Sequence, residues 1–84
     1  MKVQNSEGTK AEAAQYTGEF RNIQTWVEEV GYINPIGYAT DGDLLFLDGE
    51  EEVHVPPMDW LICYGPTKMD SCRNAEFKQL FKPA

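Results

Sequence analysis

The chain has 84 residues, enough for one small domain, and its 42% hydrophobic and 25% charged residues are typical of a globular protein rather than a disordered one. Fourteen acidic residues against seven basic ones give a formal net charge of −7, which argues against direct binding to nucleic acid or to an anionic membrane surface. No apolar run reaches the roughly 18 residues that a membrane span requires, so we expect a cytoplasmic protein that is free to meet a basic partner protein.

The first ten residues are polar and show no apolar periodicity or signal-peptide core. We therefore expect a flexible N-terminal arm over residues 1–10, followed by a single globular domain over residues 11–84. Alternation over residues 13–17 indicates a first short strand at the start of this domain.

The strongest helix signal covers residues 19–30. Apolar side chains recur there at helical spacing and form one stripe, made of Phe20, Ile23, Val27 and Val30. Thr17 or Gly18 is expected to cap the start of this helix, and Gly31 stands where a helix commonly ends.

After this helix the pattern changes to short apolar runs separated by turn sequences. Asn34-Pro35, Asp41-Gly42 and Asp48-Gly49 are turn signals, and Asp-Gly between apolar runs favours a hairpin. The runs between the turns are expected to be strands, over residues 36–40, 43–47 and 51–55.

The sequence leaves the register of the hairpin over residues 43–55 open. A two-residue turn places Leu44 and Phe46 on the face of the second strand's valines, whereas a three-residue turn places Leu45 and Leu47 there. In either register two large apolar side chains remain on the other face, which is then covered or forms part of a contact surface.

Pro56-Pro57 ends the third of these strands, because proline cannot donate to a ladder. Residues 59–64 are apolar on both faces, which predicts a central strand covered on both sides, and residues 68–72 return the chain. A short helix over residues 75–81, capped by Asn74, closes it. The expected architecture is α+β, with an antiparallel sheet of about five strands, one amphipathic helix packed on it and a short C-terminal helix.

Few side chains carry reactive chemistry. His54 is the only histidine and lies between two valines of a strand, so we expect an exposed strand residue rather than a catalytic base. Cys63 and Cys72 lie in apolar surroundings and are expected to be buried free thiols. Since zinc-ligand spacing, a calcium loop and phosphate-binding glycine motifs are all missing, we expect no metal, no cofactor and no enzymatic activity.

Two segments of the C-terminal third form a pattern. The first consists of Pro57, Asp59, Trp60, Leu61 and Ile62, and the second of Cys72, Arg73 and Phe77, followed by Phe81 and Pro83. They resemble the Pro-Gly-Asp-Trp-Ile-Ile and Cys-Lys-Pro-x-x-Phe segments of a family of small accessory proteins of bacteriophages, chiefly those that infect actinobacteria. The stretch Ala13–Gly18 is similar to the family more loosely.

The resemblance implies a phage protein expressed in an infected bacterium, and the family has no assigned activity. The sequence departs from the family pattern at Met58, where the family has glycine, and at Asn74, where it has proline. Residues 67–71 also differ from the family's Gly-Glu-Phe-Tyr-Pro stretch.

The aromatic residues are numerous for so small a core, and tyrosine and tryptophan are enriched at protein interfaces. Size, acidity and this surplus favour a non-enzymatic accessory protein that binds and modulates a host protein in the bacterial cytoplasm. The candidate binding residues are Trp26, Tyr32, Leu45, Leu47, Glu50, Glu51 and Glu52. The alternatives are an acidic nucleic-acid mimic that blocks a host DNA-binding or defence protein, a self-assembling structural phage protein, and a small-ligand enzyme with a pocket around His54 or Cys72.

Overall fold

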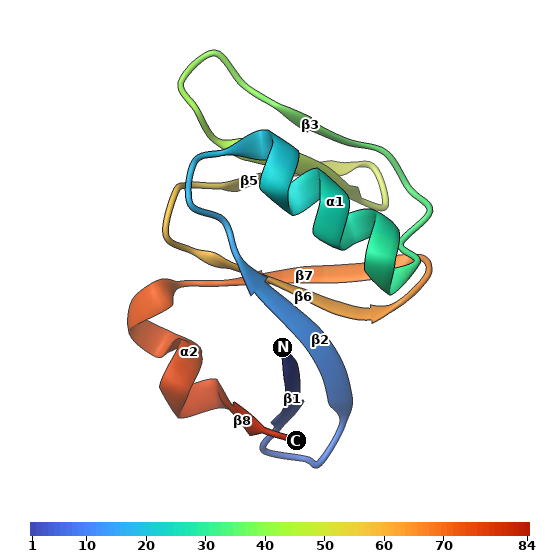
Figure 1. Ribbon diagram of the computed structural model, residues 1–84, viewed down its shortest axis with the longest axis vertical. Helices are drawn as coiled ribbons and strands as arrows, with labels where there is room; N and C mark the ends of the chain where they lie inside the picture. Colours follow the sequence, from blue (N-terminus) through green and yellow to red (C-terminus); the bar gives the residue numbers. More distant parts are fainter.

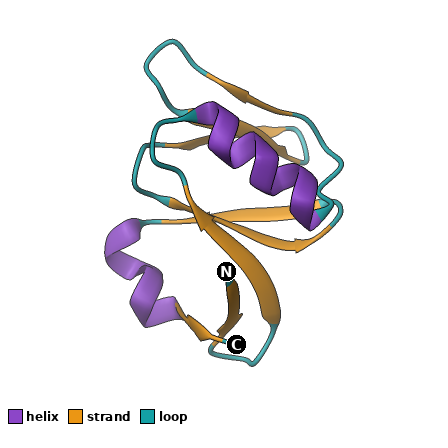
Figure 2. Cartoon of the chain, viewed as in Figure 1, coloured by secondary structure: helices purple, strands orange, loops and turns teal.

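The computed structural model describes residues 1–84 and contains two antiparallel sheets and two helices (Figure 1, Figure 2). In chain order the elements are β1 (Lys2–Asn5), β2 (Lys10–Gln15), α1 (Phe20–Val30), β3 (Ile36–Tyr38), β4 (Leu44–Asp48), β5 (Glu51–Val55), β6 (Trp60–Gly65), β7 (Lys68–Cys72), α2 (Asn74–Leu80) and β8 (Phe81–Pro83). The strand order is β7-β6-β2-β1-β8 in the five-stranded sheet and β3-β4-β5 in the three-stranded sheet. The α+β class and the antiparallel pairing expected from the sequence are confirmed.

The expectation of one sheet of about five strands is wrong, because the strands do not continue pairing from β5 into β6. β6 pairs instead with β2, where Ala13 lies opposite Ile62. Proline at positions 56 and 57 ends the β5 ladder, and a turn over residues 56–59 carries the chain from the three-stranded sheet into the five-stranded one.

The expectation of a flexible arm over residues 1–10 is also wrong. β1 lies in this segment and pairs with both β2 and β8, and Val3 is buried at 1% exposure. Because Val3 is the only large apolar residue between Lys2 and Lys10, the sequence shows no alternation there. The strand is specified by its two neighbours and not by a pattern of its own.

α1 has the apolar stripe that the sequence predicts. Ile23 and Val27 are buried, and the two end residues of the stripe pack against the same core. Gly31 ends the helix in the left-handed conformation, with φ +80°. The predicted caps are wrong at both helices, since the N-cap residues are Glu19 for α1 and Arg73 for α2, and neither makes a side-chain capping bond.

The five-stranded sheet divides the core into two clusters. The larger cluster lies among this sheet, α1 and the inner face of the three-stranded sheet; it contains Tyr16, Ile23, Val27, Tyr32, Leu44, Phe46, Val55, Leu61, Cys63 and Met69. The smaller cluster contains Val3, Ala13, Ile62, Cys72 and Phe77, the last contributed by α2. Neighbouring residues of β6 enter different clusters, which confirms the prediction of a central strand covered on both faces.

The turn over residues 56–59 fits type II. The N–H of Asp59 donates to the carbonyl oxygen of Pro56 (3.2 Å), proline fills the second position, and Met58 in the third has φ +80°. Met58 is the only residue other than glycine with a positive φ. Position 58 is therefore one where glycine is favoured on conformational grounds.

Candidate functional site

The β4–β5 hairpin adopts the register with a two-residue turn. Leu44 pairs with Val55, and Phe46 pairs with Val53, so these side chains share the inner face and pack into the core. Gly49 opens the turn with φ +65°, as the first position of a type II′ turn requires. The structure thereby decides between the two hairpin registers that the sequence leaves open.

The outer face of the hairpin carries Asp43, Leu45, Leu47, Glu52 and His54, which together we call the hairpin surface. Leu45 lies opposite His54, and Leu47 lies opposite Glu52. Leu45 is half-buried, but Leu47 is 52% exposed. Apolar side chains therefore stand among carboxylates on a face that is largely open to solvent.

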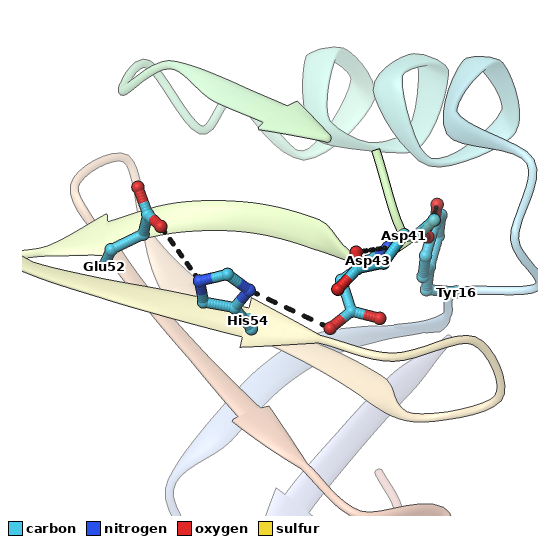
Figure 3. A network of polar contacts seen from close by, with 6 residues as sticks. Tyr16, Asp41, Asp43, Glu52 and His54 are labelled. Carbon is cyan, nitrogen blue, oxygen red and sulfur yellow. Dashed lines mark hydrogen bonds and ion pairs between the residues drawn. The ribbon is translucent and has the colours of Figure 1, made fainter. Parts of the chain in front are cut away.

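Two hydrogen bonds, one of them from a buried core residue, hold the loop between β3 and β4 in place (Figure 3). The buried Tyr16 hydroxyl donates to the carbonyl oxygen of Gly42 (2.8 Å), and the N–H of Asp43 donates to Oδ1 of Asp41 (3.0 Å). Gly42 has φ +94°, which suits the left-handed position of a three-residue hairpin loop. These bonds hold Asp43 at the edge of the hairpin surface.

The His54 ring stands between two carboxylates, as Figure 3 shows. Its Nε2 lies 2.9 Å from Oε1 of Glu52, and its Nδ1 lies 3.9 Å from Oδ2 of Asp43. The prediction of an exposed strand histidine is confirmed, since 47% of the side chain is exposed. The pKa of the Tyr16 hydroxyl is raised, mainly by the burial of this side chain. The nearby negative charge of Asp43 raises this pKa further.

The charge of the chain is divided unevenly between two parts of the fold. Residues 19–58, which contain α1 and β3 to β5 and which we call the acidic half, hold nine carboxylates and one cation, Arg21, a net charge of −8. The other residues hold five carboxylates and six cations, a net charge of +1. In Figure 1 the acidic half is the upper part of the molecule, so the whole negative excess of the protein lies at one end.

The charged side chains form almost no ion pairs with one another. None of the seven lysine and arginine side chains forms an ion pair with a carboxylate. Within the acidic half, His54 is the only side chain in ion-pair contact with a carboxylate. The negative charge of the acidic half is therefore not neutralised within the protein, and its electrostatic field can attract a basic partner from solution.

The structure brings together most of the binding residues predicted from the sequence and separates two of them. Leu45 and Leu47 lie on the hairpin surface, and the exposed residues Glu50, Glu51 and Glu52 lie at or beside the hairpin turn. By contrast, Tyr32 is 6% exposed and belongs to the larger core cluster, against which the partly buried Trp26 packs. Sequence reasoning did not select Tyr38, which is 65% exposed at the end of β3.

A pocket of about 410 Å³ lies between β5 and α2, and both His54 and Cys72 line it. Burial raises the pKa of the Cys72 thiol, and the carboxylates of Glu76, Asp70 and Asp59 raise it further. Burial also raises the pKa of Cys63. Both cysteines are buried free thiols, as predicted, and a raised pKa disfavours the thiolate that nucleophilic chemistry uses.

No set of three histidine, cysteine or acidic side chains converges as a cation site. Both helices are too short and too polar to cross a bilayer. Comparison with protein-family models, with curated proteins and with solved structures finds no match for the chain.

Proposed function

We propose that this protein is a non-enzymatic binding module that docks a basic partner protein on its acidic half, with the hairpin surface at the centre of the contact. The observation that carries this proposal is the division of charge, a net −8 on residues 19–58 against +1 elsewhere, combined with Leu47 exposed among the carboxylates. An acidic field of this kind speeds association with a basic partner and selects against acidic ones.

The composition of the hairpin surface suits a protein interface. Interfaces combine a central apolar patch with a polar rim, and here Leu45 and Leu47 lie between Asp43 and Glu52 on the same face. Burial of the exposed part of Leu47 supplies affinity, because apolar area gains about 25 cal/mol per Å² when it leaves water. The carboxylates supply attraction and orientation.

The resemblance to phage accessory proteins directs the choice of partner. We infer a protein of the infected bacterium, met in its cytoplasm and altered in activity by the docking. A basic surface on that protein is the complement that the acidic half requires.

Affinity capture from a bacterial lysate tests this proposal. The tagged wild type is compared with a hairpin variant, Glu50→Lys/Glu51→Lys/Glu52→Lys, and with a control variant, Glu7→Lys/Asp70→Lys/Glu76→Lys. All six positions are exposed, and both variants change the net charge equally. A basic protein captured by the wild type and the control, and lost from the hairpin variant, supports the proposal. Equal capture by all three, or equal loss from both variants, contradicts it.

An acidic mimic of nucleic acid is the second candidate, because the carboxylates of the hairpin lie at one end of the molecule. The leucines between them favour the first candidate, since a mimic of the phosphate backbone gains nothing from an apolar row. Competition separates the two. Duplex DNA displaces the captured partner if the docked surface is a nucleic-acid site, and leaves it bound otherwise.

A further inference from the structure

β3 has a free edge with unpaired backbone groups. Ala39 donates its N–H to the carbonyl oxygen of Asp43 (2.9 Å), and Gly37 lies opposite Leu45 in the same register. Since hydrogen-bonded pairs alternate along an antiparallel ladder, Gly37 bonds to β4 while the N–H and C=O groups of Ile36 and Tyr38 point away from it. β3 is the outermost strand of its sheet, at the rim of the molecule in Figure 1.

This edge carries fewer protective devices than the other three. Proteins protect sheet edges with charged side chains, prolines, bulges or very short strands. β5 carries Glu51 and Glu52, β7 carries Lys68 and Asp70, and β8 carries Lys82 and Pro83. β3 consists of Ile36, Gly37 and Tyr38, with no charge and no proline, so its protection is limited to its three-residue length and to Pro35, which directly precedes it. An extended segment meets no charged side chain on this strand when it adds to the edge.

One aromatic side chain beside the edge is also left uncovered. Tyr38 is 65% exposed, and its ring centroid lies 5.0 Å from that of Phe20 at the start of α1. Tyr38 lies opposite Leu44, so its ring is on the inner face of the sheet. An added strand places every second side chain on that face, where an apolar one covers the ring pair.

Carboxylates outnumber cations around β3, where Arg21, which directly follows Phe20, is the one cation. Asp41 lies in the loop that follows β3, and Glu19 directly precedes Phe20. The acidic half that contains β3 has one cation in forty residues. A segment that alternates apolar residues with lysine or arginine therefore matches both the ring pair and the field.

We propose that the edge of β3 takes up an extended basic segment of the partner as a fourth strand of the three-stranded sheet. This inference rests on the proposed function, because it names how the basic partner engages the acidic half. The backbone of Ile36 and Tyr38 supplies the hydrogen bonds, and the ring pair selects an apolar residue.

The test uses the ¹⁵N-labelled protein and a blocked peptide, Lys-Val-Lys-Val-Lys-Val, as the probe. Amide exchange at Ile36 and Tyr38 is expected to slow at least about fivefold at saturation, since those N–H groups become bonded. The same peptide N-methylated at alternate residues is expected to bind about tenfold more weakly, because it cannot form the ladder. Tyr38→Pro removes the edge donor at position 38 without touching a β3–β4 bond and is expected to abolish the protection of the Ile36 amide.

The N-methylated peptide acts on the wild type, so the test does not depend on how a variant folds. Unchanged exchange at Ile36 and Tyr38, or equal binding of the N-methylated peptide, overturns the inference. If the peptide then loses affinity only for the Glu50→Lys/Glu51→Lys/Glu52→Lys variant, it docks on the hairpin surface. In that case strand addition fails while the proposed function stands.

Discussion

Met58 offers a direct test of how the turn between the two sheets is built. It occupies the third position of the turn over residues 56–59 with φ +80°. Its backbone is held there, because its N–H donates to the carbonyl oxygen of Tyr16 and its own carbonyl accepts from Nε2 of Gln15 (2.8 Å). The residue cannot relax to negative φ without breaking these bonds. Any residue with a Cβ at this position is therefore held in an unfavourable backbone conformation.

The size of this cost follows from comparing glycine with alanine at the same position. A left-handed conformation costs a residue with a Cβ roughly 1–2 kcal/mol. Glycine escapes that cost but loses more chain entropy on folding, roughly 0.5–1 kcal/mol. Met58→Gly is therefore expected to be more stable than Met58→Ala by about 0.5–1 kcal/mol, which is a few degrees in Tm for a domain of this size.

Urea unfolding followed by tryptophan fluorescence measures the two free energies of unfolding. Both variants lose the side chain of Met58, which is 50% exposed, so most of the lost packing cancels in the comparison. A Met58→Gly variant equal to or less stable than Met58→Ala refutes the type II assignment of this turn.

Three further predictions concern the core and its titrating groups. Leu44→Ala, at a residue with 0% exposure, is expected to lower the free energy of unfolding in urea by about 2–5 kcal/mol. Leu47→Ala on the outer face is expected to lower it by under about 0.5 kcal/mol. Similar losses for the two variants would contradict the hairpin register. Asp59→Ala removes the carboxylate that accepts from the N–H of Asn74 (3.1 Å) at the start of α2 and is expected to cost about 1 kcal/mol, with Asp59→Asn costing less. The folded-state pKa values of Tyr16 and of both cysteine thiols are raised, so their contribution to stability is present at neutral pH and is lost as pH rises above about 9–10. Denaturation curves across that range should therefore show falling stability with a shallower fall for Tyr16→Phe, and an equal fall in both proteins would count against a buried, protonated hydroxyl.

Local sequence signals predicted both helices and the strands between residues 10 and 72, but neither the terminal strands β1 and β8 nor how the elements are assembled. The stripe of α1, its end at Gly31 and the strand of residues 51–55 follow from periodicity and turn chemistry within a few residues. The split into two sheets depends on β2 pairing with β6, a contact between distant segments that no local pattern encodes. β1 was missed for the same reason, because Val3 gains its burial from strands far along the chain.

The candidate surface was predicted in part. The exposed leucine of the hairpin and the three glutamates at its turn were found from composition and alternation, whereas Tyr32 could not be distinguished from a surface aromatic until the core was known. The free edge of β3 was missed because it depends on which strands remain unpaired. The division of charge is present in the sequence, but its meaning depends on α1 packing with β3 to β5 at one end of the fold.

The most direct test of docking on the acidic half is the Kd of the purified complex with the captured partner. It is measured for the wild type, for Glu50→Lys/Glu51→Lys/Glu52→Lys and for Glu7→Lys/Asp70→Lys/Glu76→Lys at low and at high salt. If the acidic half is the docking surface, the hairpin variant binds about tenfold or more weakly than the control at low salt, and the gap narrows as salt screens the charges. Equal Kd values for the two variants at low salt would show that the partner does not dock on the acidic half.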